Sequence, residues 1–83
     1  MAEARFIRIR FFAVLREQAG TSALDLQTTA STPLELYREL QASHKLTFDP
    51  KLLRVAINER YVTMDTTLQA DDQVVFIPPV AGG

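Results

Sequence analysis

Apolar and polar residues alternate along three stretches of the chain, and this alternation is typical of half-buried β-strands. The three stretches are residues 5–12, 21–28 and 73–77. In the first stretch, Ile7 and Ile9 point to one side, while the arginines beside Ile9 point to the other. We therefore expect a sheet that has one face against a hydrophobic core.

Two helices are predicted between these strands. Residues 13–19 are good helix formers, and Gly20 suits the left-handed position that follows a helix. Thr32 and the proline after it begin a longer amphipathic helix that runs to about residue 42 or 43. Glu35 completes a Thr-x-x-Glu capping box at the start of this helix. The longer helix is the natural cover for the apolar face of the sheet.

A short turn and a hairpin follow the long helix. Residues 49–53 predict a single helical turn that has an aspartate cap, a proline in the first position and two anchoring leucines at its end. The apolar runs 53–57 and 61–64 flank Asn58, a residue that tolerates positive φ. These runs therefore predict a β-hairpin with a tight turn.

The order of these elements predicts one α+β domain over residues 1–83, a ubiquitin-like β-grasp roll. Its mixed five-stranded sheet has one main helix packed on one face. The first and last strands are the most apolar on both faces, so we expect them to pair in parallel in the middle of the sheet. Pro78 and Pro79 cannot donate ladder hydrogen bonds, so the sheet should end there. Residues 78–83 then form a flexible Gly-Gly tail.

Composition narrows the function classes. The chain has 83 residues, of which 47% are hydrophobic and 23% charged, as in an ordinary soluble domain. Its net charge of −1 gives no general attraction to nucleic acid or to an anionic membrane. We interpret the N-terminal arginines as a solvated strand face; they are Arg5, Arg8, Arg10 and Arg16. With no signal peptide and no apolar run long enough for a bilayer, the expected location is the cytoplasm.

Side-chain catalysis has little support in the sequence. The single histidine, His44, lies in a polar stretch and is interpreted as a solvated surface residue. Asp71 and Asp72 are interpreted as hydrated turn residues, because no further metal ligands follow at suitable spacing. No cysteine is present, and no base partner is evident for the serines, which are Ser22, Ser31 and Ser43. We therefore expect no side-chain catalytic machinery, bound cofactor or metal on this chain.

The C-terminal Gly82-Gly83 is the chemical feature that remains. Glycines lack a Cβ, so such a tail can thread a channel too narrow for other residues and bring the Gly83 carboxylate to a buried reactive atom. A carboxylate becomes an acyl donor when it is activated, usually through adenylation by ATP on a partner enzyme. The alternative is a frayed end whose glycines are incidental.

The two ends of the chain resemble a known family, the small sulfur-carrying subunits of molybdopterin synthase. The matching segments are Phe76 to Gly83, Phe11-Phe12-Ala13-x-x-Arg16-Glu17-x-x-Gly20, Ile57-Asn58 with Val62, and Asp72 before Val74. The resemblance covers the chain from Phe6 onward. Asp71 stands where this family often has glycine, and aspartate tolerates the left-handed conformation that such a glycine adopts.

The resemblance implies a sulfur-transfer cycle. An adenylating enzyme similar to the ubiquitin activators uses ATP to form an acyl-adenylate at Gly83, and a sulfur donor then yields the thiocarboxylate. The tail inserts into the large synthase subunit, where catalysis occurs, and donates sulfur to precursor Z, a cyclic pyranopterin monophosphate. The inserted residues are Pro78, Pro79, Val80, Ala81 and Gly82. The family implies a heterotetramer of two small and two large subunits.

Strand alternation also predicts a docking patch. Val75 and Ile77 face away from the long helix, with Phe12 on the same side and Tyr61 nearby. Apolar side chains near the root of the tail suggest contact with a partner, although they could instead form a second small core under loops. Two other functions stay open. The chain could be a ubiquitin-like modifier or a carrier for thiamine or tRNA thiolation, or it could be a plain interaction module.

Overall fold

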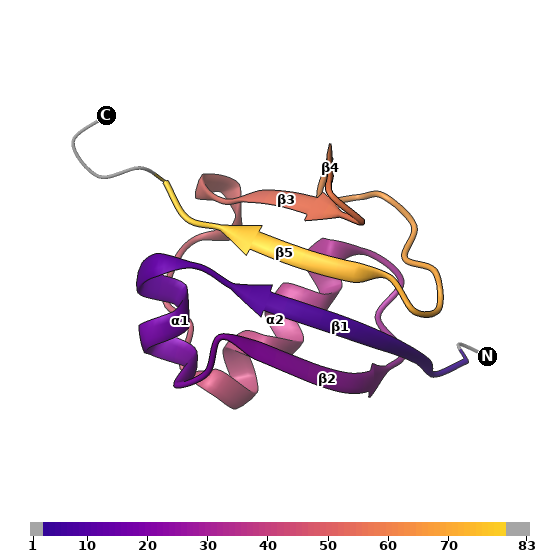
Figure 1. Cartoon of the computed structure of the whole chain (residues 1–83), viewed down its shortest axis with the longest axis horizontal. Coiled ribbons are helices and arrows are strands. Elements are labelled where there is room, and N and C mark those ends of the chain that lie inside the picture. The colour runs from indigo at the N-terminus through magenta and orange to yellow at the C-terminus, as the bar shows by residue number, and fades with distance from the viewer. Residues whose placement is uncertain (1–2, 80–83) are drawn as a thin grey trace.

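The computed structural model describes residues 3–79, which form a mixed five-stranded sheet with one long helix behind it (Figure 1). The elements in chain order are β1 (Arg5–Phe11), α1 (Ala13–Ala19), β2 (Ala23–Thr28), α2 (Pro33–His44), the 3₁₀ turn η1 (Pro50–Leu52), β3 (Arg54–Ile57), β4 (Arg60–Val62) and β5 (Gln73–Ile77). The strand order across the sheet is β2-β1-β5-β3-β4. This arrangement confirms the predicted β-grasp roll.

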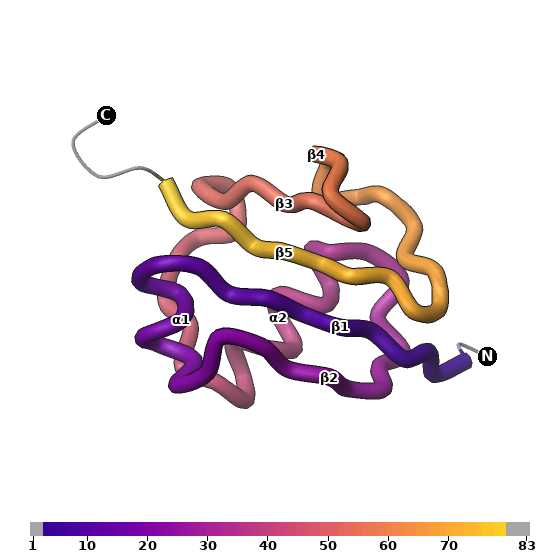
Figure 2. Tube along the Cα trace, viewed as in Figure 1, coloured from indigo at the N-terminus to yellow at the C-terminus, as the bar shows by residue number. Residues whose placement is uncertain are grey.

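Strands β1 and β5 run side by side in the same direction in the middle of the sheet (Figure 2). In their parallel register, Ile9 lies opposite Val74 and Phe11 lies opposite Phe76. Strand β2 pairs antiparallel with β1 on one side, and β3 pairs antiparallel with β5 on the other. The two strands that are richest in large apolar residues thus occupy the most protected positions, as expected.

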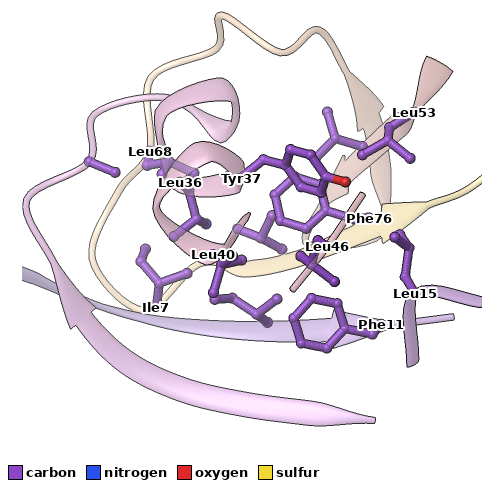
Figure 3. Close-up of a cluster of buried hydrophobic side chains, with 14 of the residues drawn as sticks. Ile7, Phe11, Leu15, Leu36, Tyr37, Leu40, Leu46, Leu53, Leu68 and Phe76 are labelled. Atoms are coloured by element: carbon purple, nitrogen blue, oxygen red, sulfur yellow. The ribbon is translucent and has the colours of Figure 1, made fainter. Parts of the chain in front are cut away.

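Helix α2 packs its apolar stripe against one face of the sheet, which we call the covered face (Figure 3). Leu36, Tyr37 and Leu40 on this helix are at most 1% exposed. The ring of Tyr37 lies 5.3 Å from the ring of Phe76, centroid to centroid, and its hydroxyl donates a hydrogen bond to the Phe48 carbonyl at 2.9 Å. Burial raises the pKa of Tyr37 above its usual value, because the charged phenolate is poorly solvated there.

The helix ends follow the predicted capping chemistry, with one difference. Gly20 has a φ of 77° after α1, and the Thr32 hydroxyl accepts a hydrogen bond from the Glu35 N–H at 3.2 Å. The Glu35 carboxylate, however, accepts hydrogen bonds from the N–H and hydroxyl of Ser31, one residue before the expected partner. Only the Thr32 half of the predicted box is therefore confirmed, and α2 extends to His44.

Two local predictions change in the structure. The turn at η1 is capped by Asp49 as expected, but of its two leucines only Leu53 is buried, while Leu52 is 57% exposed. The hairpin turn is confirmed, because Asn58 and Glu59 have φ values of 52° and 72° between β3 and β4. Its second strand is shorter than predicted. Among residues 3–79, no helix is long and apolar enough to cross a bilayer.

Candidate functional site

The predicted tail leaves the body of the protein at the end of β5. Ile77 is the last paired residue of that strand, opposite Arg54 of β3. Pro78 is buried and Pro79 is exposed, so the chain is held against the sheet through the first of the two prolines. Four of the predicted site residues lie outside the described residues; they are Val80, Ala81, Gly82 and Gly83. The described structure therefore defines the root of the tail.

An open groove of about 490 Å³ lies beside this root. Its lining comes from η1, β3, β4 and the end of β5, and consists of Leu52, Arg54, Tyr61, Ile77, Pro78 and Pro79. Leu52 and Tyr61 are the two most exposed large apolar side chains of the groove, at 57% and 73%. A mostly apolar lining with one guanidinium at its side is suited to contact with another protein rather than to bond-breaking chemistry.

The four predicted docking residues are not all gathered in this groove. Tyr61 and Ile77 line it, whereas Val75 lies two residues before Ile77 on β5, on the same face of the sheet, opposite α2. Val75 and Tyr61 are connected through Ala56, which pairs with both residues. Phe12 is 49% exposed and follows Phe11, whose partner is Phe76. The docking role itself stays a prediction.

Two groove residues were missing from the sequence-based site. Leu52 was assigned to the core because the Asp-Pro turn motif indicates where a turn lies but not which side of it faces outward. Arg54 was not singled out, although it begins an alternating strand and therefore shares a face with Ala56. The alternation of β3 could have identified Arg54, whereas the outward position of Leu52 depends on how η1 packs.

The remaining polar candidates do not form a site at the root of the tail. The Ser43 hydroxyl lies 2.7 Å from Nδ1 of His44, so the expectation that Ser43 lacks a base partner was wrong. The two residues are consecutive at the C-terminal end of α2, and neither lines the groove. Among residues 3–79, no three histidine, cysteine or acidic side chains are grouped so that they could hold a metal ion.

Asp71 and Asp72 differ from each other in the structure. Asp71 is exposed and has a φ of 69°, the left-handed conformation that aspartate tolerates. Asp72 is only 6% exposed, so its interpretation as a hydrated turn residue was wrong. Its carboxylate accepts hydrogen bonds from Nδ2 of Asn58 at 2.9 Å and from the N–H of Gln69 at 2.8 Å. These bonds offset the cost of burying the charge, and they tie the hairpin turn to the start of β5.

A family model and a known relative each match nearly the whole chain. The ThiS family model matches residues 9–83. The molybdopterin synthase sulfur carrier subunit of Escherichia coli (strain K12) is 34% identical over 80 residues, which is 93% of this chain and 99% of the relative. The family match at residues 9–83 includes the two segments near the chain ends that carry the sequence resemblance.

Solved structures agree on the fold. The solution structure of the Haloferax volcanii HVO 2177 protein has a TM-score of 0.80 at 31% identity and covers 96% of this chain and 88% of that one. A protein–protein complex of subunits 1 and 2 of molybdopterin-converting factor from Helicobacter pylori 26695 contains a chain with a TM-score of 0.65 at 24% identity. That match covers 94% of this chain and 99% of that chain, and at this identity it shows the fold alone.

Proposed function

The chain belongs to the ThiS family, and from this we propose that it is the small, sulfur-carrying subunit of a molybdopterin synthase. The observation that carries the proposal is the extent of the family match, which runs through the tail to Gly83. A match to the β-grasp body alone would support only the fold. The E. coli relative, a sulfur carrier subunit, is matched over nearly its whole length.

The proposed reacting group is the carboxylate of Gly83. Its oxygen attacks the α-phosphorus of ATP on an adenylating partner, pyrophosphate leaves, and an acyl-adenylate forms. A donor at the oxidation level of sulfide then attacks the acyl carbon, and AMP leaves with the bonding electron pair. The product is a thiocarboxylate. ATP is bound and consumed by the partner enzyme, and no cofactor is assigned to this chain.

The second half of the cycle takes place on the large subunit. The thiocarboxylate sulfur attacks a carbon of precursor Z and displaces an oxygen substituent, which leaves with the C–O electron pair and takes up a proton. Water then hydrolyses the resulting thioester at its acyl carbon, so the acyl C–S bond breaks, the Gly83 carboxylate is restored and a thiol remains on the substrate. The residues that bind and activate precursor Z belong to the large subunit, so this chain does not catalyse the reaction alone. The H. pylori structure contains two subunits of a related converting factor, and we propose an equivalent pairing here.

The described body suits a carrier of this kind. Pro78 is packed against the end of the sheet and Pro79 is exposed beside it, so the following residues start from a fixed point. Prolines restrict φ and so reduce the directions in which the chain can leave the body. The apolar groove at that point gives a partner a surface to hold while it receives the tail. Tyr61 and Ile77 are the proposed contacts within it.

Intact-mass spectrometry tests the carrier chemistry. The purified chain is incubated with an adenylating enzyme of the molybdopterin pathway, ATP and a sulfide donor. We expect a mass gain equal to the exchange of one oxygen for sulfur, and no gain in a variant that lacks Gly83. The Ala42→Asp variant, an exposed change on α2, serves as a control that keeps both the tail and the predicted docking patch intact. Absence of the mass gain, when an authentic carrier is charged under the same conditions, would falsify the proposal.

A second measurement separates this function from the alternatives of the sequence analysis. The thiocarboxylated chain is mixed with a large synthase subunit and precursor Z, and molybdopterin is measured after oxidation to its fluorescent derivative. Formation of molybdopterin supports the synthase assignment. Charging without molybdopterin formation points instead to a carrier for thiamine or tRNA thiolation, or to a protein modifier.

A further inference from the structure

The side of the sheet opposite α2, which we call the uncovered face, carries an ordered set of side chains. It is the side turned toward the viewer in Figure 1. One row crosses all five strands through paired positions, and it consists of Ala23, Arg10, Val75, Ala56 and Tyr61. On one side of that row, Arg8 lies between Asp25 and Gln73. On the other side, Ile77 lies opposite Arg54.

The charges on this face differ in sign from the charge of the whole chain. The strands place three arginines and one aspartate on it, a net charge of +2, whereas the chain carries −1. The charged residues of the face are Arg8, Arg10, Arg54 and Asp25. All other acidic residues of the chain lie in helices, turns or loops. The net charge is therefore positive on the side that no helix covers and negative over the rest of the chain.

The arginines border the apolar positions of the face. Arg10 is directly opposite Val75, and Arg54 is directly opposite Ile77. Arg8 and Arg10 line a shallow hollow of about 150 Å³ together with Asp25 and Gln73. Arg54 lines the groove at the tail root. Arg8, Arg10 and Arg54 are all exposed, so their guanidinium groups are accessible to a partner.

We propose that the large synthase subunit meets this face with a surface in which carboxylates flank an apolar patch. The carboxylates contact Arg10 and Arg54, and the apolar patch covers the strip between them, formed by Val75 and Ile77. Guanidinium groups bind carboxylates with two parallel hydrogen bonds, which fixes register as well as adding attraction. This proposal rests on the proposed function and adds the chemistry of the partner surface. It also changes the interpretation of Arg10 from a solvated residue to a contact residue.

Charge argues against the other occupants of this face. A second copy of the chain would place two faces of net charge +2 against each other, and like charges in an interface are unfavourable. A nucleic acid would offer phosphates to the arginines but no apolar partner surface to Val75, Ile77 and Tyr61. A partner protein with both acidic and apolar groups satisfies both parts of the face.

Association kinetics with the large subunit test the proposal. Stopped-flow association rates are measured at about 0.05 M and about 0.5 M NaCl, since salt screens the attraction between exposed charges. The test variants are Arg10→Glu and Arg54→Glu, and the matched control is Arg38→Glu, which makes the same charge change at an exposed position of α2. We expect each test variant to lower the low-salt association rate more than tenfold, and the control to change it less than threefold. The differences should shrink at high salt.

Several outcomes overturn the proposal. Equal effects of Arg10→Glu and Arg38→Glu, or a wild-type rate that does not depend on salt, exclude carboxylate pairing on this face. A wild-type dimer in sedimentation equilibrium that Arg10→Glu strengthens, or RNA binding that Arg10→Gln abolishes, assigns the face to another occupant. If Arg10→Glu does not fold, Arg10→Gln and Arg54→Gln replace the charge reversals, with an expected threefold loss.

Failure of this proposal is distinguishable from failure of the proposed function. A chain that accepts sulfur at Gly83 and binds the large subunit with normal rates in all arginine variants keeps the carrier function and loses only the acidic contact. A chain that accepts no sulfur and shows no binding in the wild type loses both. The mass measurement therefore tests sulfur transfer to Gly83, and the rate measurement tests the contact between the arginines and the large subunit.

Discussion

The two faces of the same pair of strands have opposite characters. On the covered face, Ile9 and Val74 have no exposed area and pack under α2. On the uncovered face, Arg10, the neighbour of Ile9, is exposed, and Val75, the neighbour of Val74, is half-buried. One residue step along β1 or β5 thus separates a core position from a surface position. Because side chains alternate along a strand, a single short segment can supply both stability and recognition.

This comparison implies that substitutions on the two faces should affect different measurements. Changes on the covered face should lower the free energy of unfolding and affect binding only through loss of folded protein. Changes on the uncovered face should alter binding by a partner while the free energy of unfolding stays nearly constant.

Phe76→Ala should be the most damaging single change. Phe76 has no exposed area, and its ring contacts that of Tyr37. Removing a buried phenylalanine costs about 3–5 kcal/mol, because the lost burial and the cavity both contribute. The matched change on the other face, Val75→Ala, should cost less than about 1 kcal/mol. Urea unfolding followed by circular dichroism measures both, and equal costs would contradict the division of the two faces.

Asp72→Asn tests whether a buried polar group behaves like the apolar core. The two oxygens of Asp72 accept hydrogen bonds from Asn58 and Gln69, and an asparagine would present a donor to one of these donors. We expect a loss of about 1–3 kcal/mol in the free energy of unfolding, because a part-buried hydrogen bond to a charged oxygen is lost. Asp71→Asn is the control, because Asp71 is exposed and asparagine also tolerates positive φ.

If the two aspartate variants have the same stability, the hydrogen bonds of Asp72 contribute nothing beyond what water supplies. A double-mutant cycle with Asn58→Ala identifies the partner. In the cycle, the loss from Asp72→Asn should be smaller when Asn58 is already absent, since the two residues share one bond.

Phe12→Asp should change binding rather than stability. Phe12 is 49% exposed between β1 and α1, so an aspartate there leaves the core intact. We expect the affinity for the large subunit to fall more than tenfold, about 1.4 kcal/mol. Ala42→Asp, an exposed change on α2, should leave the affinity within about twofold. Isothermal titration calorimetry gives the affinity, and normal binding by a folded Phe12→Asp protein would remove Phe12 from the docking patch.

The covered face could be predicted from the sequence, because it depends on local patterns. Alternation in β1 placed Ile9 on the core side, and the outward prediction for Val75 and Ile77 in β5 leaves Val74 and Phe76 on the core side, where they are buried. The parallel pairing of the two strands followed from their apolar character. The tail glycines were also evident in the sequence, although they lie outside the described residues.

Apart from Arg54, the positions that were missed depend on contacts between distant parts of the chain. Asp72 is buried because Asn58, 14 residues earlier, supplies a hydrogen bond from the hairpin turn. Leu52 faces outward because η1 places Leu53, not Leu52, against the core. The groove at the tail root needs side chains from β3, β4 and β5 together. No local pattern contains this information, since each case depends on how separate elements pack.

Replacing Tyr37 or Tyr61 by phenylalanine gives the test with the smallest expected change in the free energy of unfolding. The pair separates the two faces, because the two tyrosines lie on opposite sides of the sheet. At neutral pH, Tyr37→Phe should cost about 0.5–1 kcal/mol, since the Phe48 carbonyl keeps its hydrogen bond from Gln41 at 3.2 Å. Burial raises the pKa of Tyr37 in the folded protein, so the folded state keeps this proton at a pH where the unfolded chain, with a tyrosine pKa of about 10, loses it.

The contribution of Tyr37 is therefore present below about pH 10 and is lost as the pH rises through the folded pKa. The difference between the unfolding free energies of the wild type and of Tyr37→Phe, measured from about pH 8 to about pH 11, should decrease as the pH rises above about 10. Tyr61→Phe, a change at a side chain that is 73% exposed, should follow the wild type throughout. A constant difference between the wild type and Tyr37→Phe over this range would show that the buried hydroxyl does not couple its ionisation to folding. Alkaline pH would then lower the free energy of unfolding of the wild type no more than that of Tyr37→Phe.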